Sequence, residues 1–186
     1  MKALKHLRTI LTHKHYVRKY CFMCGLYKQG ILHDLSKFSP TEFWESAKYW
    51  QGTRSPILAC KEDKGYSKAW LHHKGRNKHH WEYWLDDFEK GTIPKKIPFN
   101  YVLEMICDFM AAGTVYKGKD FSFQVEYDWW LEKKKVILVH KDTMELLTEI
   151  MDQMLKQGIE PVLKNRGYLK LLERNYTDDE YRRNTF

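Results

Sequence analysis

Ile31-Leu32-His33-Asp34-Leu35-Ser36-Lys37 places a histidine directly before an aspartate, with apolar residues on both sides of the pair. The apolar residues Ile31, Leu32 and Leu35 are expected to be buried, because apolar side chains gain free energy by leaving water. An unpaired carboxylate is costly to bury, so Asp34 is expected to need a partner. A divalent metal ion is a suitable partner, since several such metals accept imidazole and carboxylate ligands. The stretch therefore predicts a metal-binding His-Asp pair inside the fold.

The composition is that of a folded protein with one substantial core. The chain has 186 residues, of which 43% are hydrophobic and 15% aromatic, enough for one domain with an extension. No apolar run approaches the roughly 20 residues that cross a bilayer, and the N-terminus lacks the apolar block of a signal peptide. A cytoplasmic protein without a membrane partner is expected, with its four cysteines as reduced thiols.

Positive charge is concentrated at the N-terminal end of the chain. The net charge is +8, and residues 1–37 hold eight lysines and arginines against one acid, Asp34. This distribution indicates an anionic substrate or partner. The alternative, that these cations form a solvated helix face, stays open.

A long helix is predicted from Lys2 to about Lys28, ended by Gly30 before the His-Asp pair. Its buried stripe recurs at helical spacing and comprises Ala3, Ile10, Val17, Cys21 and Cys24. His13 falls on this stripe and points inward, whereas His15 falls on the opposite side. The two cysteines are expected to pack in the core, because no second close ligand pair completes a zinc site.

A second ligand-rich stretch holds four histidines between His72 and His80. It follows a helix begun by Ser39-Pro40-Thr41-Glu42, a capping pattern, and a further helix near residues 65–73. Gly75 and Asn77 predict a turn that could aim His73, His79 and His80 at one point. A histidine-rich surface loop is the alternative.

The next helix is predicted from Phe99 to about Tyr116, after a polar connection at residues 89–96. Asp108 lies on its largely apolar face and therefore needs a partner. Ala111, Ala112 and Gly113 allow another segment to approach closely. Residues 121–186 are expected to form a helical extension, with one helix at residues 159–172.

The ordered polar residues resemble those of the HD-domain superfamily of metal-dependent phosphohydrolases. A helix-borne histidine (His13), an adjacent pair (His33-Asp34) and an aspartate on a later helix (Asp108) follow that pattern. The two-metal members add one histidine and then a His-His pair, as His73 and His79-His80 do here. The resemblance implies an all-α, HD-domain-like helical bundle over residues 1–120, with residues 121–186 as a helical extension packed on it.

A narrower resemblance covers most of residues 1–120. Leu-His-Asp-Leu-Ser-Lys-Phe-Ser-Pro and His-His-X-Glu-Tyr-Trp mark an uncharacterised bacterial and phage family, which brings no known activity. The spacing from His13 to His33 is shorter than is usual in the superfamily. The metal count therefore stays open: one ion on His13, His33, Asp34 and Asp108, or two ions that share Asp34, with His73, His79 and His80 on the second. His72 is the spare histidine of this set.

The superfamily resemblance implies hydrolysis of a phosphoester, of a nucleotide or a related small anion, by metal-activated hydroxide. The metal would be Fe, Mn, Co, Ni, Zn or Mg. Asp34 and Lys37 are the expected catalytic residues, and Lys37, Lys14 and Arg18 are expected to bind the substrate. Glu82 and Glu104 are candidates for orienting the imidazoles.

Two rival functions stay open. One is a non-catalytic, metal-stabilised helical protein, and the other is a basic module that binds nucleotides or nucleic acid. Nucleic acid and a second copy of the chain also stay open as partners.

Overall fold

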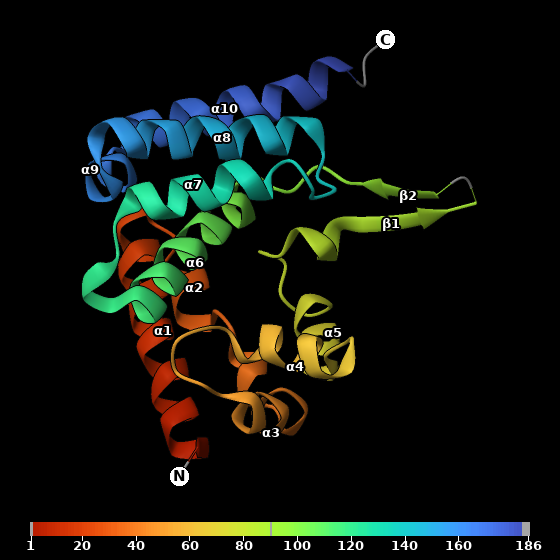
Figure 1. Cartoon of the computed structure of the whole chain (residues 1–186). Helices are drawn as coiled ribbons and strands as arrows, with labels where there is room; N and C mark the ends of the chain where they lie inside the picture. Colours follow the sequence, from red (N-terminus) through yellow and green to blue (C-terminus); the bar gives the residue numbers. More distant parts are fainter. Residues whose placement is uncertain (1, 90, 184–186) are drawn as a thin grey trace.

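The computed structural model describes residues 2–89 and 91–183 and is mostly helical, which confirms the all-α prediction. Two strands form a small antiparallel sheet beside the helices (Figure 1). The longer elements, in chain order, are α1 (Lys2–Cys24), α2 (Tyr27–Leu32), α3 (Pro40–Tyr49), α4 (Pro56–Lys64), α5 (Lys68–Lys74), β1 (Leu85–Phe88), β2 (Gly91–Pro94), α6 (Phe99–Lys117), α7 (Phe123–Lys133), α8 (Lys141–Gln157), α9 (Ile159–Lys164) and α10 (Arg166–Arg183).

The centre of the fold is the pair α1 and α6, which pack on each other. The predicted inward stripe of α1 is buried at Ile10, Val17, Cys21 and Cys24. Val17 and Cys21 join one hydrophobic core with the buried face of α6, from Val102 to Ala111. All four cysteines are free and buried, and Cys21 and Cys24 pack in this core as expected. The packing of α1 on α6 therefore fixes the relative positions of His13, on α1, and Asp108, on α6.

The first helix is shorter than predicted, because it ends at Cys24 rather than near Lys28. Gly25 has a φ of +83°, a conformation that glycine adopts without steric cost, and it redirects the chain into α2. Gly30 was expected to break the chain but lies inside α2. A Cβ atom at Gly30 would lie 2.9 Å from the Cβ of Cys21, so this glycine allows α2 to pack against α1.

The helices α3, α4 and α5 form a separate layer beside the N-terminal half of α1 (Figure 1). Ser39 caps α3 as predicted, its hydroxyl oxygen accepting from the Glu42 N–H at 3.4 Å. The helix α4 was not predicted; it follows Ser55 with Pro56 in its first turn. The helix predicted near residues 65–73 begins later, at Lys68 after the Ser67 cap.

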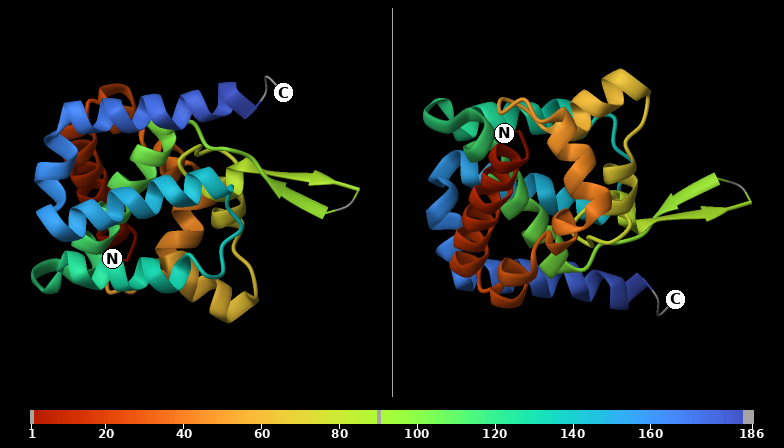
Figure 2. Two further views of the ribbon diagram at one scale, coloured as in Figure 1. Left: turned by 90° about the horizontal axis from the view of Figure 1, so that it is seen from above. Right: turned by 90° about the horizontal axis from the view of Figure 1, so that it is seen from below.

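The predicted polar connection at residues 89–96 is wrong in part, because β1 and β2 form a hairpin there. Leu85 pairs with Pro94 and Phe88 pairs with Gly91. The hairpin extends away from the helices in every view (Figures 1 and 2), and almost all its side chains are exposed. Exposure of both faces removes the apolar alternation by which a strand is recognised.

The helices after residue 120 pack onto the central pair. The fully buried residues Trp130, Met151 and Leu163 belong to the same hydrophobic core as Val17 of α1. The helix predicted at residues 159–172 is two helices, because the chain turns at Asn165 between α9 and α10. Within the described residues, no helix combines the length and the apolar character that crossing a membrane requires.

Candidate metal centre

The His-Asp pair lies at the turn between α2 and a short 3-10 helix, Leu35–Phe38. Asp34 has a φ of +56°, and it is the one non-glycine residue with a positive φ in the described chain. This left-handed conformation costs about 1 kcal/mol for most side chains, and aspartate tolerates it better than most. It turns the chain so sharply that His33 and Asp34 both point into the protein.

Burial in this stretch is the reverse of the expectation for its apolar residues. Ile31, Leu32 and Leu35 are each about half exposed, whereas His33 and Asp34 are 2% and 1% exposed. The reversal follows from the left-handed turn, which directs the polar pair inward and leaves its apolar neighbours outside. Buried polar groups of this kind need partners.

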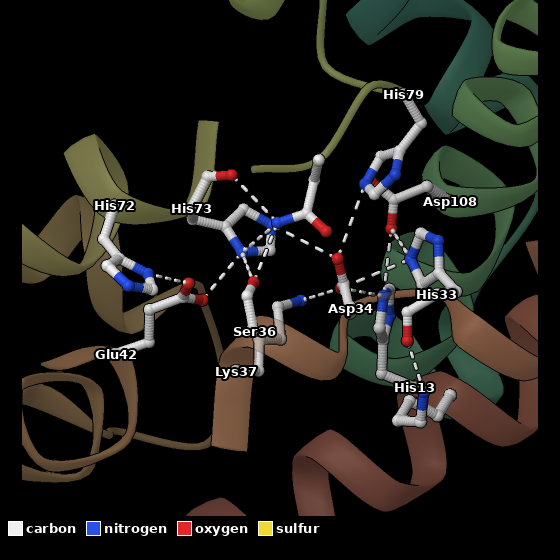
Figure 3. Close-up of polar contacts among 12 residues, drawn as sticks. His13, His33, Asp34, Ser36, Lys37, Glu42, His72, His73, His79 and Asp108 are labelled. Carbon is white, nitrogen blue, oxygen red and sulfur yellow. Dashed lines mark hydrogen bonds and ion pairs between the residues drawn. The ribbon is translucent and has the colours of Figure 1, made fainter. Parts of the chain in front are cut away.

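A first group of four side chains meets between α1, the turn and α6 (Figure 3). The His13 Nε2 atom lies 2.9 Å from the Asp108 Oδ1 atom and 3.5 Å from the Asp34 Oδ2 atom. The His33 Nε2 atom lies 3.2 Å from Asp34 Oδ2 and 3.4 Å from Asp108 Oδ1. These four residues are the set expected for a single metal ion.

A second group shares Asp34 and adds the three histidines of the 73–80 segment. The Nε2 atoms of His73 and His79 lie 3.3 Å and 3.5 Å from the Asp34 Oδ1 atom. The predicted turn brings these rings together, since Asn77 donates from its side chain to the carbonyl of His73 at 2.8 Å. One Asp34 oxygen therefore faces each group, the arrangement expected for two ions that share Asp34.

Two buried glutamates orient the histidine rings. The Glu104 Oε1 atom lies 2.8 Å from the Nδ1 atom of His33 and 3.1 Å from that of His79. The Glu42 Oε2 atom lies 2.7 Å from the Nδ1 atom of His73. A hydrogen bond from Nδ1–H to a carboxylate fixes the ring orientation, so that Nε2 is the atom left to bind a metal when it gives up its proton, and these Nε2 atoms face Asp34.

The arrangement fits a metal by two further criteria. Among the described residues, the Nε2 atoms of His13, His33, His79 and His80 and both Asp34 oxygens make no hydrogen bond of acceptable geometry. Short distances without hydrogen-bond geometry are expected where lone pairs converge on one ion. Four carboxylates also gather at this centre, and among the described residues only that of Asp34 forms an ion pair with an ammonium group, that of Lys37; those of Glu42, Glu104 and Asp108 pair with histidines. The site therefore has the donor atoms and the negative charge to hold a divalent cation.

Local charges keep the carboxylates ionised. Burial alone would raise the pKa of Asp34, but His33 and Lys37 outweigh it and hold that pKa well below its usual value. Asp108 behaves alike, because His13 and His33 outweigh the effect of burial on its pKa. Burial would lower the pKa of Lys37, but Asp34 and Asp108 raise it on balance. The Lys37 Nζ atom lies 2.5 Å from Asp34 Oδ2 as a permanent cation.

Two cavities reach the centre from different sides. One, of about 180 Å³, is bounded by α1, α3, α5 and α6 and reaches His13, His73, His80 and Asp108. The other, of about 320 Å³, reaches His33, Asp34 and His79 and is lined by Lys28, Arg76 and Lys78. The centre is thus buried but accessible to a small molecule.

Of the three residues expected to bind the substrate, only Lys37 lies at a cavity that reaches the centre. Lys37 lines the smaller cavity, whereas neither Lys14 nor Arg18 lines either cavity that reaches the centre. The Lys14 ammonium group donates to the backbone carbonyl of His33, so it supports the His-Asp turn. Arg18 is exposed on the outer face of α1. Much of the basic segment is therefore not directed at the site.

Of the two glutamates expected beside the imidazoles, Glu104 contacts them and Glu82 does not. Burial raises the pKa of Glu82, and the positive charges of Lys133, Lys74 and Lys61 only partly oppose this rise. Glu42 was predicted only as part of the capping pattern of its helix, not as a neighbour of the histidines. The Glu42 carboxylate contacts both His73 and His72, with its Oε1 atom 2.6 Å from the His72 Nδ1 atom, and its place on the buried face of α3 was the available signal.

The comparisons with known proteins return one family. The model of a family described as "Family of unknown function (DUF5662)" matches residues 2–153. No curated protein and no solved structure matches the chain.

Proposed function

We propose a function from the metal centre itself, because the chain belongs to the DUF5662 family, whose function is unknown. The proposal is that the protein is a metal-dependent phosphohydrolase that acts on a phosphoester, a nucleotide or a related small anion. One or two divalent ions are its cofactor. The HD-domain-like arrangement of residues 1–120 is part of this proposal.

The observation that carries the proposal is the position of Asp34 between two groups of donors. His13, His33 and Asp108 lie on the side of its Oδ2 atom, and His73 and His79 on the side of Oδ1. Shared carboxylates of this kind suit paired metal sites, in which a bound divalent ion supplies Lewis acidity and lowers the pKa of water to about 7. His13, His33, Asp34 and Asp108 would hold one ion, and Asp34, His73, His79 and His80 the other.

An accessible site favours catalysis over a purely structural role. Structural metal sites are closed by protein ligands, whereas catalytic sites keep a position open. Here the Asp108 side chain is 14% exposed, and the smaller cavity adjoins Asp108, His13 and His80. A phosphoester therefore has a route to the donor atoms.

The protein's own groups have distinct roles in this proposal. Glu104 and Glu42 hold the imidazole rings with their Nε2 atoms directed at the proposed metal positions. Lys37 lines the cavity and stays protonated. Once Asp34 is engaged by a cation, the Lys37 ammonium group is free to bind a phosphoryl oxygen and to stabilise charge that develops there.

The experiment begins with elemental analysis of the purified protein. Metal-free protein is then loaded separately with Mn²⁺, Co²⁺, Fe²⁺ or Mg²⁺ and screened against phosphate esters. Asp34→Asn is the sharpest variant, because asparagine also tolerates a positive φ and keeps the turn while removing the charge. His15→Ala is the matched control, since His15 is exposed on the same helix as His13.

We expect Asp34→Asn to lower the bound metal and to abolish hydrolysis, while His15→Ala keeps both. Metal without turnover of any ester would instead support the metal-stabilised protein. An Asp34→Asn variant with full metal content and activity would end the proposal.

A further inference from the structure

The smaller cavity continues beyond the metal centre into a mostly apolar chamber. Past the histidines and Asp108 it is lined chiefly by Ile10, Pro56, Ala69, Trp70, Ala112 and Val115. The whole cavity, including its part at the metal centre, has a volume of about 180 Å³. Pockets for drug-sized ligands are larger, roughly 300–1,000 Å³. The chamber therefore suits one ring-sized group rather than an extended molecule.

His6 lines this chamber and carries a buried polar atom that has no partner among the described residues. The residue is 5% exposed and lines the cavity, with its ring against that of Phe43 at 5.5 Å between centroids. The Nδ1 atom of His6 has no hydrogen-bond partner in the described part of the chain. A buried polar atom without a hydrogen-bond partner is unfavourable. A ligand that offers such a partner to His6 should therefore bind more tightly than one that does not.

His6 is uncharged near neutral pH. Burial, assisted by the positive charge of Lys37, lowers its pKa to about 4. A neutral imidazole nitrogen accepts a hydrogen bond from a hydroxyl or amine, or donates one to a carbonyl in its other tautomer. Lys37 is the one lysine or arginine among the described residues that line the cavity. The chamber thus disfavours a second anionic group, because nothing beyond Lys37 would neutralise it.

We propose that this chamber binds the uncharged, ring-sized organic group of the substrate, and that His6 selects groups bearing a hydrogen-bonding substituent. The inference rests on the proposed function, in which the phosphoryl group lies at the metal centre beside Lys37. The substrate class is then a phosphate monoester of a small neutral ring compound with a hydroxyl, amide or ring-nitrogen group away from the ester.

The test uses phosphonates, which bind like phosphate esters but cannot be hydrolysed. Calorimetry on the metal-loaded, full-length protein compares phenylphosphonate with 3- and 4-hydroxyphenylphosphonate. One hydrogen bond to a neutral group predicts that at least one hydroxylated ligand binds roughly 2- to 12-fold more tightly. His6→Leu should remove this preference, and His15→Leu, on the exposed side of the same helix, should retain it.

A second variant tests the chamber without changing His6. Ala112→Phe fills it, so all three aryl ligands should bind at least tenfold more weakly, whereas methylphosphonate should bind as it does to the wild type. Thermal melts establish that each variant is folded.

Equal binding of the three aryl ligands to the wild type, or no binding, would overturn the inference. So would a preference that survives His6→Leu, or unchanged aryl binding by Ala112→Phe. Ester hydrolysis is measured in parallel. Selective binding without turnover refutes the proposed function alone, and turnover without selectivity refutes the chamber alone.

Discussion

Glu104 gives the most specific prediction, because its one oxygen contacts rings from both donor groups. The Oε1 atom lies 2.8 Å from His33 and 3.1 Å from His79, and Glu104 is 4% exposed. Burial would raise the pKa of Glu104, but hydrogen bonds from these two rings outweigh it and lower the pKa. The group is therefore a carboxylate, and Glu104→Gln replaces it with a neutral acceptor of equal size.

The expected loss follows from the strength of the two hydrogen bonds. Bonds to a charged group contribute about 1.5–3 kcal/mol and neutral ones about 0.5–1.5 kcal/mol. For each ring, the hydrogen bond that holds its orientation becomes about 1–1.5 kcal/mol weaker. This free energy corresponds to a roughly tenfold lower affinity for each metal ion. In other metalloproteins, mutation of a residue that hydrogen-bonds to a metal ligand lowers metal affinity or activity about 10–100-fold, which is of the same order.

The assay is metal titration of the metal-free protein against a competing chelator, read as affinity and as ions per chain. Glu42→Gln is the matched control, since Glu42 orients His73 of the second group and no ring of the first. Glu104→Gln should weaken both ions, whereas Glu42→Gln should weaken one. Unchanged affinities in Glu104→Gln, or the loss of a single ion, would refute the reasoning.

Three further predictions concern stability. Lys37→Met should destabilise the metal-free protein by roughly 3–5 kcal/mol, because it leaves the buried Asp34 carboxylate without its ammonium partner; denaturant titration with and without metal should show a larger gain from metal than in the wild type. Burial raises the pKa of Glu126 to about 7 from 4.5, so the unfolded chain ionises first and wild-type stability falls as the pH rises between these values. Glu126→Gln should therefore gain up to about 3 kcal/mol over the wild type at pH 8 and little at pH 4.5, and equal melting shifts at both pH values would contradict this. Gly30→Leu should destabilise the fold by more than about 1 kcal/mol, because its Cβ would press on Cys21, and a melting temperature equal to that of the wild type would exclude this packing.

Helical periodicity was enough to find the candidate ligands that lie on long helices. His13 lies between Ile10 and Val17 on the buried stripe of α1, and Asp108 lies between buried residues of α6. Each is a polar residue at a position that the helical pattern predicts to be buried, so each could be recognised without knowledge of its partners. The turn at Gly75 and Asn77 similarly indicated that the following histidines converge.

Residues whose position depends on distant partners were harder to predict. Glu42 satisfies a local capping pattern, and its partners His72 and His73 lie about 30 residues further along the chain. The exposure of Ile31 and Leu35 depends on the left-handed turn at Asp34, which no local pattern announces. The missed helix α4 is a different case, because Ser55-Pro56 carries the same start signal as Ser39-Pro40.

The layer α3–α5 has few apolar groups of its own to attach it to the rest of the molecule. Its buried hydrophobic residues Ala47, Ala59, Cys60 and Ala69 are small and lie outside the main core. Much of its attachment is polar, through Glu42 and His73 to Asp34. A cation bound there would act as a cross-link between two lobes. Removal of such a cation should then loosen α3–α5, while α1 and the helices from α6 onward stay packed in the main core.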